Sequence, residues 1–180
     1  YCDQQWHYYK DGSGDRKAGA DVNVVPVWEQ VTTGNPSVIV SVVDGGIALE
    51  HPDLKDNVIA GGKTGSKNFI NNSYVITPHD HGTHVAGTIG AVNNNGMGVC
   101  GLAGGNAAAR QKGVKLLSCQ IFSDDGGNGD SEAAIKCGAD HGAVISQNSW
   151  GYQADSNNDN NVSQEELAAF KQTSISSALK

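Results

Sequence analysis

The residues with the clearest chemical potential in this sequence are an aspartate and a histidine. Asp44 follows the hydrophobic run Val40–Val43, and His81 opens the stretch His81-Gly-Thr-His-Val-Ala-Gly87. A carboxylate that orients an imidazole makes the ring an effective general base. One class of serine hydrolases presents the first two members of its Ser-His-Asp triad in this order along the chain. The spacing therefore predicts that Asp44 orients His81 for hydrolysis, although Asp-Gly after a strand is also a common turn.

The flanking sequence predicts the elements that would position these two side chains. The uncharged, β-branched run at 37–43 is typical of a strand that is buried on both faces of a sheet. Small and apolar residues in helical register follow His81 as far as Val92. Further strands are predicted at 114–122, at 143–146 and near 68–70, and further helices at 131–141 and 164–180.

Alternating strands and helices predict an α/β fold with a doubly wound, mainly parallel sheet that is covered by helices on both faces. We expect residues 1–36 to form an arm packed on the domain, and residues 37–180 to be its N-terminal portion. The sequence ends inside a predicted helix, so we expect the remaining strands to lie outside it. Active groups in such sheets gather beyond the carboxyl ends of the strands, where Asp44 lies.

Composition narrows the class of protein. A formal net charge of -7 argues against a nucleic-acid partner, because no basic stripe is available to neutralise phosphates. No apolar run approaches the roughly 18 residues of a membrane span. We expect three of the four cysteines, Cys100, Cys119 and Cys137, to be buried small side chains. Four cysteines also allow three disulfide pairings, which the sequence leaves open.

Three stretches carry a resemblance to a known family. Val42-Val43-Asp44-Gly45-Gly46-Ile47, with His51-Pro52-Asp53-Leu54 behind it, resembles the aspartate block of the subtilisin-like serine peptidases (subtilases). His81–Thr88 resembles their histidine block, and Asn148-Ser149-Trp150-Gly151 is similar to their substrate-binding strand. Gly45 is a departure, since many relatives carry Thr or Ser there. The resemblance implies a serine endopeptidase with Asp44 and His81 as catalytic residues.

The resemblance also implies what the sequence lacks. Neither the family's oxyanion asparagine nor its Gly-Thr-Ser block with the nucleophile is found in these residues. We therefore expect the serine to lie on a C-terminal remainder of the same domain, and this chain alone to be inactive. The expected peptide or protein substrate would lie along main-chain groups of Ser149, Trp150 and Gly151, with Gly127 and Gly129 on its other side.

Two loops carry residues that could bind a structural Ca²⁺ ion. No organic cofactor is expected. The resemblance implies a site formed by the Asp53 carboxylate, the Asn94 side chain and the carbonyls of Val92, Met97 and Val99. This loop is one residue longer than the commonest version, and an Asn/Gly turn without an ion is the alternative.

The second loop has the ligand spacing of an EF-hand, with Asn160 in place of the usual glycine. Its candidate ligands are Asp155, Asn157, Asp159, Asn161 and Glu166. A solvated acidic loop is the alternative.

Other interpretations were weighed against the peptidase. His79, His81 and His84 lack the spacing of a zinc peptidase, so we expect His84 to be a packed helix residue. A catalytically inactive subtilase-like module and a calcium-binding interaction module are the alternative functions. We expect the protein to be secreted, cell-surface or periplasmic. Because half a parallel sheet exposes an apolar edge, we also expect this chain not to be stable alone.

Overall fold

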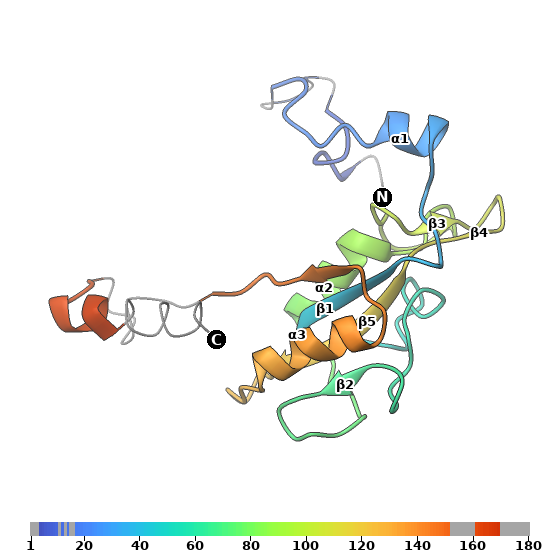
Figure 1. The fold of residues 1–180 in the computed structure, drawn as a ribbon. Helices are drawn as coiled ribbons and strands as arrows, with labels where there is room; N and C mark the ends of the chain where they lie inside the picture. Colours follow the sequence, from blue (N-terminus) through green and yellow to red (C-terminus); the bar gives the residue numbers. More distant parts are fainter. Residues whose placement is uncertain (1–3, 11, 13, 15–16, 152–160, 170–180) are drawn as a thin grey trace. The chain divides into compact units, whose positions relative to one another are not determined.

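The computed structural model describes residues 4–10, 12, 14, 17–151 and 161–169. The chain divides into two compact units, residues 1–148 and residues 149–180. A parallel sheet with the strand order β2-β5-β1-β6 forms the centre of the first unit (Figure 1). Its strands are β1 (Ile39–Gly45), β2 (Lys67–Asn68), β5 (Lys115–Phe122) and β6 (Ile145–Gln147). Val40 pairs with Leu116 on one side and with Ile145 on the other, so β1 is an interior strand.

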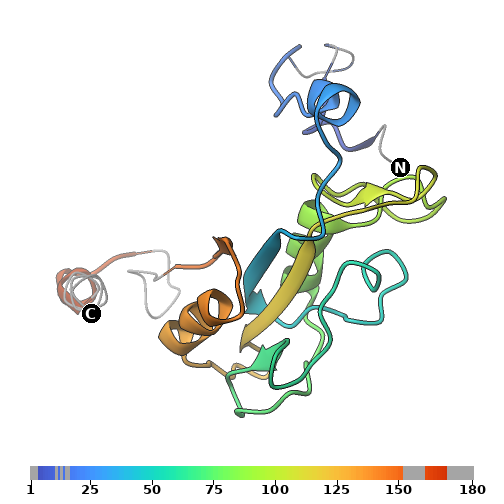
Figure 2. The same ribbon diagram turned by 45° about the vertical axis from the view of Figure 1, so that its right-hand side comes forward.

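Helices cover both faces of this sheet, because successive side chains of a strand point to opposite sides. Val40 and Val42 belong to the core that includes Ala86 of α2 (Asp80–Gly90). Ser41 faces the other side, where Gly138 of α3 (Ser131–Asp140) approaches it so closely that a Cβ there would lie 2.5 Å from the Ser41 Oγ. Figure 2 shows the two helices on opposite faces. The predicted doubly wound α/β fold is confirmed.

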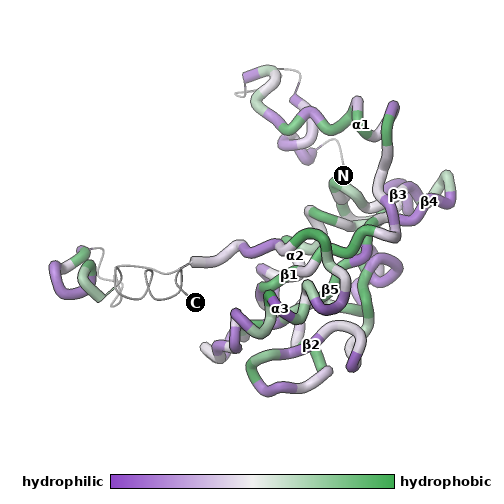
Figure 3. Tube along the Cα trace, in the orientation of Figure 1, coloured by the Kyte–Doolittle hydropathy of each residue, from purple (hydrophilic) through white to green (hydrophobic). Residues whose placement is uncertain are grey.

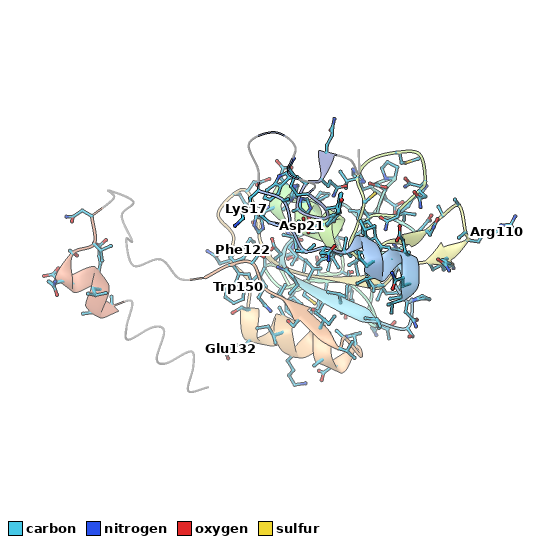
Figure 4. All side chains as sticks on the ribbon, turned by 90° about the horizontal axis from the view of Figure 1, so that it is seen from above. Lys17, Asp21, Arg110, Phe122, Glu132 and Trp150 are labelled. Carbon is cyan, nitrogen blue, oxygen red and sulfur yellow. The ribbon has the colours of Figure 1, made fainter. Side chains whose placement is uncertain are left out.

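Local sequence explains where the two helices begin. The Asp130 Oδ1 accepts a hydrogen bond from the Ala133 N–H at 2.9 Å, which caps α3. Glu132, labelled in Figure 4, lies in the first turn of α3, where its charge favours the positive end of the helix. α2 is capped instead by His79, whose side chain accepts from the backbone N–H of His81. A histidine cap is unusual, and the sequence analysis did not predict it.

Two small elements were not predicted. Helix α1 (Val25–Gln30) begins with Pro26 in its first turn. Strands β3 (Gly105–Asn106) and β4 (Gln111–Lys112) form a short antiparallel hairpin, and Arg110 points outward from its tip (Figure 4). Both are too short, at six residues and at two residues per strand, for sequence periodicity to reveal them.

The N-terminal residues are held by hydrogen bonds to the loop after α2. The Gln5 side-chain amide both donates to the Cys100 carbonyl, at 2.9 Å, and accepts from the Cys100 N–H, at 2.6 Å. The Tyr8 hydroxyl donates to the same carbonyl at 2.7 Å, and its ring packs edge-on against Trp28. Burial raises the pKa of Tyr8 to about 12, so this hydroxyl stays a donor.

The cysteines correct one expectation. Cys100 is buried as expected, but it is disulfide-bonded, so it is not simply a small apolar side chain. Cys119 and Cys137 are free, and burial raises the pKa of the Cys119 thiol to about 11. Cys119 therefore stays protonated at neutral pH and contributes as a small buried side chain.

The described part of the second unit contains a helical segment at residues 164–169. Ser163 and Glu166 cap its start reciprocally: the Glu166 N–H donates to the Ser163 Oγ at 3.1 Å, and the Ser163 N–H donates to the Glu166 Oε2 at 3.0 Å. Within the residues that the structure describes, no helix has the length and apolarity needed to cross a bilayer.

Strand β6 forms an edge of the sheet in the first unit. Among the described strands it pairs with β1 alone. Val144 and Ile145 are 73% and 51% exposed, and the segment that leads into β6 is coloured green, for apolar, in Figure 3. An exposed apolar edge strand is a template for pairing with another segment and favours aggregation when it is left open.

We therefore expect that residues 1–180, produced without any further segment, do not unfold as a cooperative monomer. Calorimetry and size-exclusion chromatography check this, with a chain extended by the expected C-terminal remainder as the control. A monomeric 1–180 chain with a single sharp melting transition would contradict the expectation.

Candidate functional site

The candidate site begins where β1 ends. The pairing of β1 with β5 shifts register between Asp44 and Gly45, and such an irregularity re-aims side chains at the end of a strand. Asp44 is only 1% exposed. Its Oδ1 accepts the Gly45 N–H at 2.7 Å and lies 2.7 Å from the His81 Nδ1. The structure thus brings together the two residues that the sequence predicted to act as a pair.

The protonation of the His81 ring follows from its partner. An ionised carboxylate only accepts hydrogen bonds, so in the neutral ring the proton lies on Nδ1 and Nε2 keeps its lone pair. Among the described residues no hydrogen-bond partner occupies that Nε2. The His81 side chain is 53% exposed, so an incoming group can reach it. The geometry is that of an oriented general base.

The backbone at the start of α2 is pressed against the end of β1. A Cβ at Gly82 would lie 2.0 Å from the Gly45 carbonyl oxygen, so glycine is required there. Thr83 adds side-chain bonds, since its Oγ1 accepts the Ala48 N–H at 3.0 Å and donates to the Gly46 carbonyl at 3.5 Å. The Gly-Thr that follows His81 is therefore what fixes the histidine over Asp44.

The second oxygen of the Asp44 carboxylate takes no part in the contact with His81. The Asp44 Oδ2 is buried and has no hydrogen-bond partner among the described residues. Burying a carboxylate oxygen without a partner is costly, so a donor from water or from a further segment of the protein is expected to reach it.

Asp53 organises the predicted calcium loop. It is 2% exposed, and its Oδ2 accepts the Val99 N–H at 2.8 Å while its Oδ1 accepts the Asn95 Nδ2 at 2.7 Å. Asn95, which was not among the predicted ligands, thus contacts Asp53 through its amide nitrogen. Asn94 as a calcium ligand stays a prediction.

The remaining loop residues surround a hollow. Residues 94–100 line a cavity of about 320 Å³, and Met97 and Val99 are among them. Asn94, Gly96 and Gly98 have left-handed backbone conformations, and Val92 donates its N–H to the Asp53 carbonyl at 2.9 Å. No group of three or more His, Cys, Asp or Glu side chains that could hold a metal is found among the described residues. A cation at Asp53 would therefore depend on carbonyl and amide oxygens.

The candidate substrate-binding glycines lie in the turn after β5. The Gly127 carbonyl accepts the Ser123 N–H, and its N–H donates to the Asp125 Oδ1, both at 3.2 Å. Hydrogen bonds to Ser123 and Gly127 also lower the pKa of Asp125. The Gly129 N–H donates to the Ile121 carbonyl at 2.7 Å. These main-chain groups are engaged within the turn itself.

The other candidate residues belong to the second unit. Ser149, Trp150 and Gly151 open that unit. Asp155, Asn157 and Asp159 lie outside the described residues. Asn161 and Glu166 are described, and Glu166 carries the helix cap given above. The Ser-x-x-Glu pattern at 163–166 was the sequence signal for that cap.

The histidines near the site do not form a cluster with His81. His51, His79 and His84 line a cavity of about 770 Å³ beside α2, together with Asp53, whereas His81 does not line it. His84 is an exposed residue of α2, so the expectation that it is packed is wrong. His79 was considered only as a metal ligand, and its contact with His81 was missed.

The chain is similar in sequence to a known protein family and to several known proteins. A model described as the Subtilase family matches residues 35–178. Fervidolysin from Fervidobacterium pennivorans is 39% identical over 69% of this chain and 18% of its own length. The Aeromonas extracellular serine protease from Aeromonas sobria is 39% identical over 64% of this chain and 18% of its own.

A solved structure supports the fold. The serine protease of Aeromonas sobria, in complex with its chaperone, aligns with a TM-score of 0.60 and 30% identity over 95% of this chain and 28% of its own. The chain spans less than a fifth of the length of the first curated relatives it matches.

The geometry of the Asp53 loop predicts different costs for two glycine substitutions. Gly96 and Gly98 both have positive φ values, but a Cβ at Gly98 would lie 2.0 Å from the Asp53 Oδ2, and one at Gly96 would meet nothing within 4 Å. Gly96→Ala should cost about 1–2 kcal/mol from the left-handed backbone alone. Gly98→Ala should lower the melting temperature of the full-length protein by several degrees more. Equal melting temperatures for the two variants would contradict this packing.

Proposed function

The chain belongs to the subtilase family, and from that premise we propose that the protein is a serine endopeptidase with His81 as its general base and Asp44 as its orienting carboxylate. The observation that carries the proposal is the 2.7 Å contact between the Asp44 Oδ1 and the His81 Nδ1, which leaves the Nε2 available. In this mechanism the Nε2 takes the proton of the attacking serine and later returns it to the leaving amine. Asp44 holds the tautomer and stabilises the imidazolium.

The nucleophile has to come from outside residues 1–180, since the Gly-Thr-Ser block is not in the sequence. We propose that it lies on a C-terminal remainder of the same domain, which adds strands beyond β6. The exposed apolar residues Val144 and Ile145 at that edge support this placement. The buried Asp44 Oδ2 is a natural acceptor for a donor that the completed domain supplies.

The substrate is proposed to be a peptide or protein in extended form. Main-chain groups of Ser149–Gly151 would add it as a strand, which gives affinity without requiring a particular side chain. Gly127 and Gly129, in the turn after β5 of the first unit, are proposed as further substrate-binding residues, because small residues allow a close approach of backbones.

A calcium ion is proposed at the Asp53 loop, where it would stabilise the fold. The residues fit a hard cation, since the buried Asp53 carboxylate contacts Asn95 and Val99, and these two residues line the hollow at 94–100. Asp53, Asn94 and the carbonyls of Val92, Met97 and Val99 would hold the ion. Because Asn95 directs its Nδ2 at Asp53, binding would require that amide to turn. The acidic loop that ends at Glu166 stays a prediction.

Secretion is proposed from two observations. Cys100 is disulfide-bonded, which is typical of oxidising compartments. One relative is named as an extracellular protease.

The catalytic proposal predicts that a fluorophosphonate probe labels a serine of the full-length native protein beyond position 180. His81→Ala should abolish the labelling. Asp44→Asn should lower kcat by about ten-thousandfold, because the amide imposes the wrong tautomer on the ring. His51→Ala is the matched control, since His51 does not contact the pair. Labelling is read by mass spectrometry of the modified peptide, and kcat from hydrolysis of a peptide substrate.

Two other outcomes would identify the alternatives. A full-length protein that is folded but takes no label would favour an inactive binding module. Absence of label together with tight calcium binding would favour a calcium-binding interaction module.

The calcium proposal predicts that chelation lowers the melting temperature of the full-length protein by several degrees. A ligand present at a hundred times its Kd stabilises the folded state by about 2.7 kcal/mol. Asp53→Asn should remove most of this shift, whereas Asp56→Asn, at an exposed neighbouring carboxylate, should keep it. The same chelation shift in the wild type and in Asp53→Asn would argue against this site.

A further inference from the structure

His79 contacts the backbone of the proposed base. It lies two residues before His81, at the cap position of α2, and its Nδ1 accepts the His81 N–H at 3.1 Å. Its own carbonyl accepts the Thr83 N–H at 2.9 Å. The His81 N–H has no partner inside the helix, whereas the Thr83 bond is the first regular backbone bond of α2. His79 thus accepts one bond through its side chain and one through its carbonyl, and so fixes the backbone that carries the imidazole of His81.

The His79 ring also fills the space beside Gly45. A Cβ at Gly45 would lie 2.4 Å from the His79 Cγ and 2.6 Å from its Nδ1. No side chain can stand at position 45 while the ring keeps this place. The imidazole therefore occupies the space that a side chain at position 45 would need.

The far side of the ring is held as well. The His79 Nε2 lies 3.2 Å from the Asp124 Oδ1. In the neutral tautomer with its proton on Nε2, the Nδ1 accepts from His81 and the Nε2–H faces the Asp124 carboxylate. Asp124 is highly exposed, so this contact contributes little by itself. The contact with Asp124 nevertheless selects the tautomer that can cap α2.

We propose that His79 is a positioning residue for His81 and that Gly45 and His79 act as a matched pair. Their fit sets the orientation of the first turn of α2, and through it the placement of the base over Asp44. This inference rests on the proposed peptidase function. It is distinct from that function, because the Asp44 and His81 pair could act with a different residue at the cap.

The test is a double-mutant cycle in the full-length protein. His79→Asn keeps an acceptor at the cap, since asparagine is a preferred cap residue, and should keep kcat within about threefold. His79→Ala should lower kcat by about tenfold or more with KM nearly unchanged, because a small displacement of a catalytic group is costly. Gly45→Ser should lower kcat similarly, since the new side chain displaces the ring. His84→Asn, on the same helix, is the matched control.

The decisive comparison is Gly45→Ser in the His79→Gly background, because glycine removes the Cβ, Cγ and Nδ1 that a side chain at position 45 would meet. We expect the serine to lower kcat by a smaller factor there than it does in the wild type. Additive losses in the double variant would overturn the matched pair, even if His79→Ala failed to fold. Unchanged kcat in His79→Ala would overturn the positioning role.

A second readout separates this inference from the peptidase proposal. Hydrogen exchange of the His81 amide should be faster in His79→Ala than in the wild type and should be restored in His79→Asn. Equal protection in all three proteins would overturn the inference. A wild type without label or peptidase activity, but with this exchange pattern, would instead refute the proposed function and leave the positioning contact standing.

Discussion

The structure depends on one close approach between backbones, that of the first turn of α2 to the end of β1. Gly82 meets the Gly45 carbonyl where any Cβ would collide with it, and a Cβ at Gly46 would lie 2.0 Å from the Thr77 carbonyl oxygen. Side chains at these positions would move α2 away from β1 and break the hydrogen bond between Asp44 and His81. The Asp44 and His81 side chains reach each other only because Gly45, Gly46 and Gly82 have no side chains.

The burial of Asp44 also makes its hydrogen bonds essential to this arrangement. Asp44 lies on an interior strand, and both of its hydrogen bonds among the described residues fall on Oδ1. A buried carboxylate needs such donors, so His81 stabilises Asp44 as much as Asp44 orients His81. Gln120 is the residue of β5 that pairs with Asp44, and its buried side-chain oxygen accepts the Thr77 N–H at 2.9 Å. It holds the segment that leads into the cap of α2.

Sequence reasoning recovered the elements that have a strong pattern. The β-branched run before Asp44, the strand before Phe122 and the helices after His81 and Ser131 all lie within about two residues of their predicted bounds. The pairing of Asp44 with His81 followed from two motifs. The His79 contact could not be predicted from cap preferences, which favour Ser, Thr, Asp and Asn. The sequence feature that relates to this contact is Gly45, because its missing side chain leaves the space that the His79 ring occupies.

The order of the strands explains how the Asp44 and His81 pair is positioned by interior contacts of the sheet. β1 is braced by β5 on one side and β6 on the other, so the end that carries Asp44 does not depend on strands beyond β6. α2 packs on β1 and β5, which places the His81 backbone by the same interior contacts. Asp44 and His81 are thus placed by the centre of the sheet, whereas the proposed serine would have to meet them beyond its edge strand β6. The contacts that orient the imidazole all lie between β1, the first turn of α2 and the segment before it.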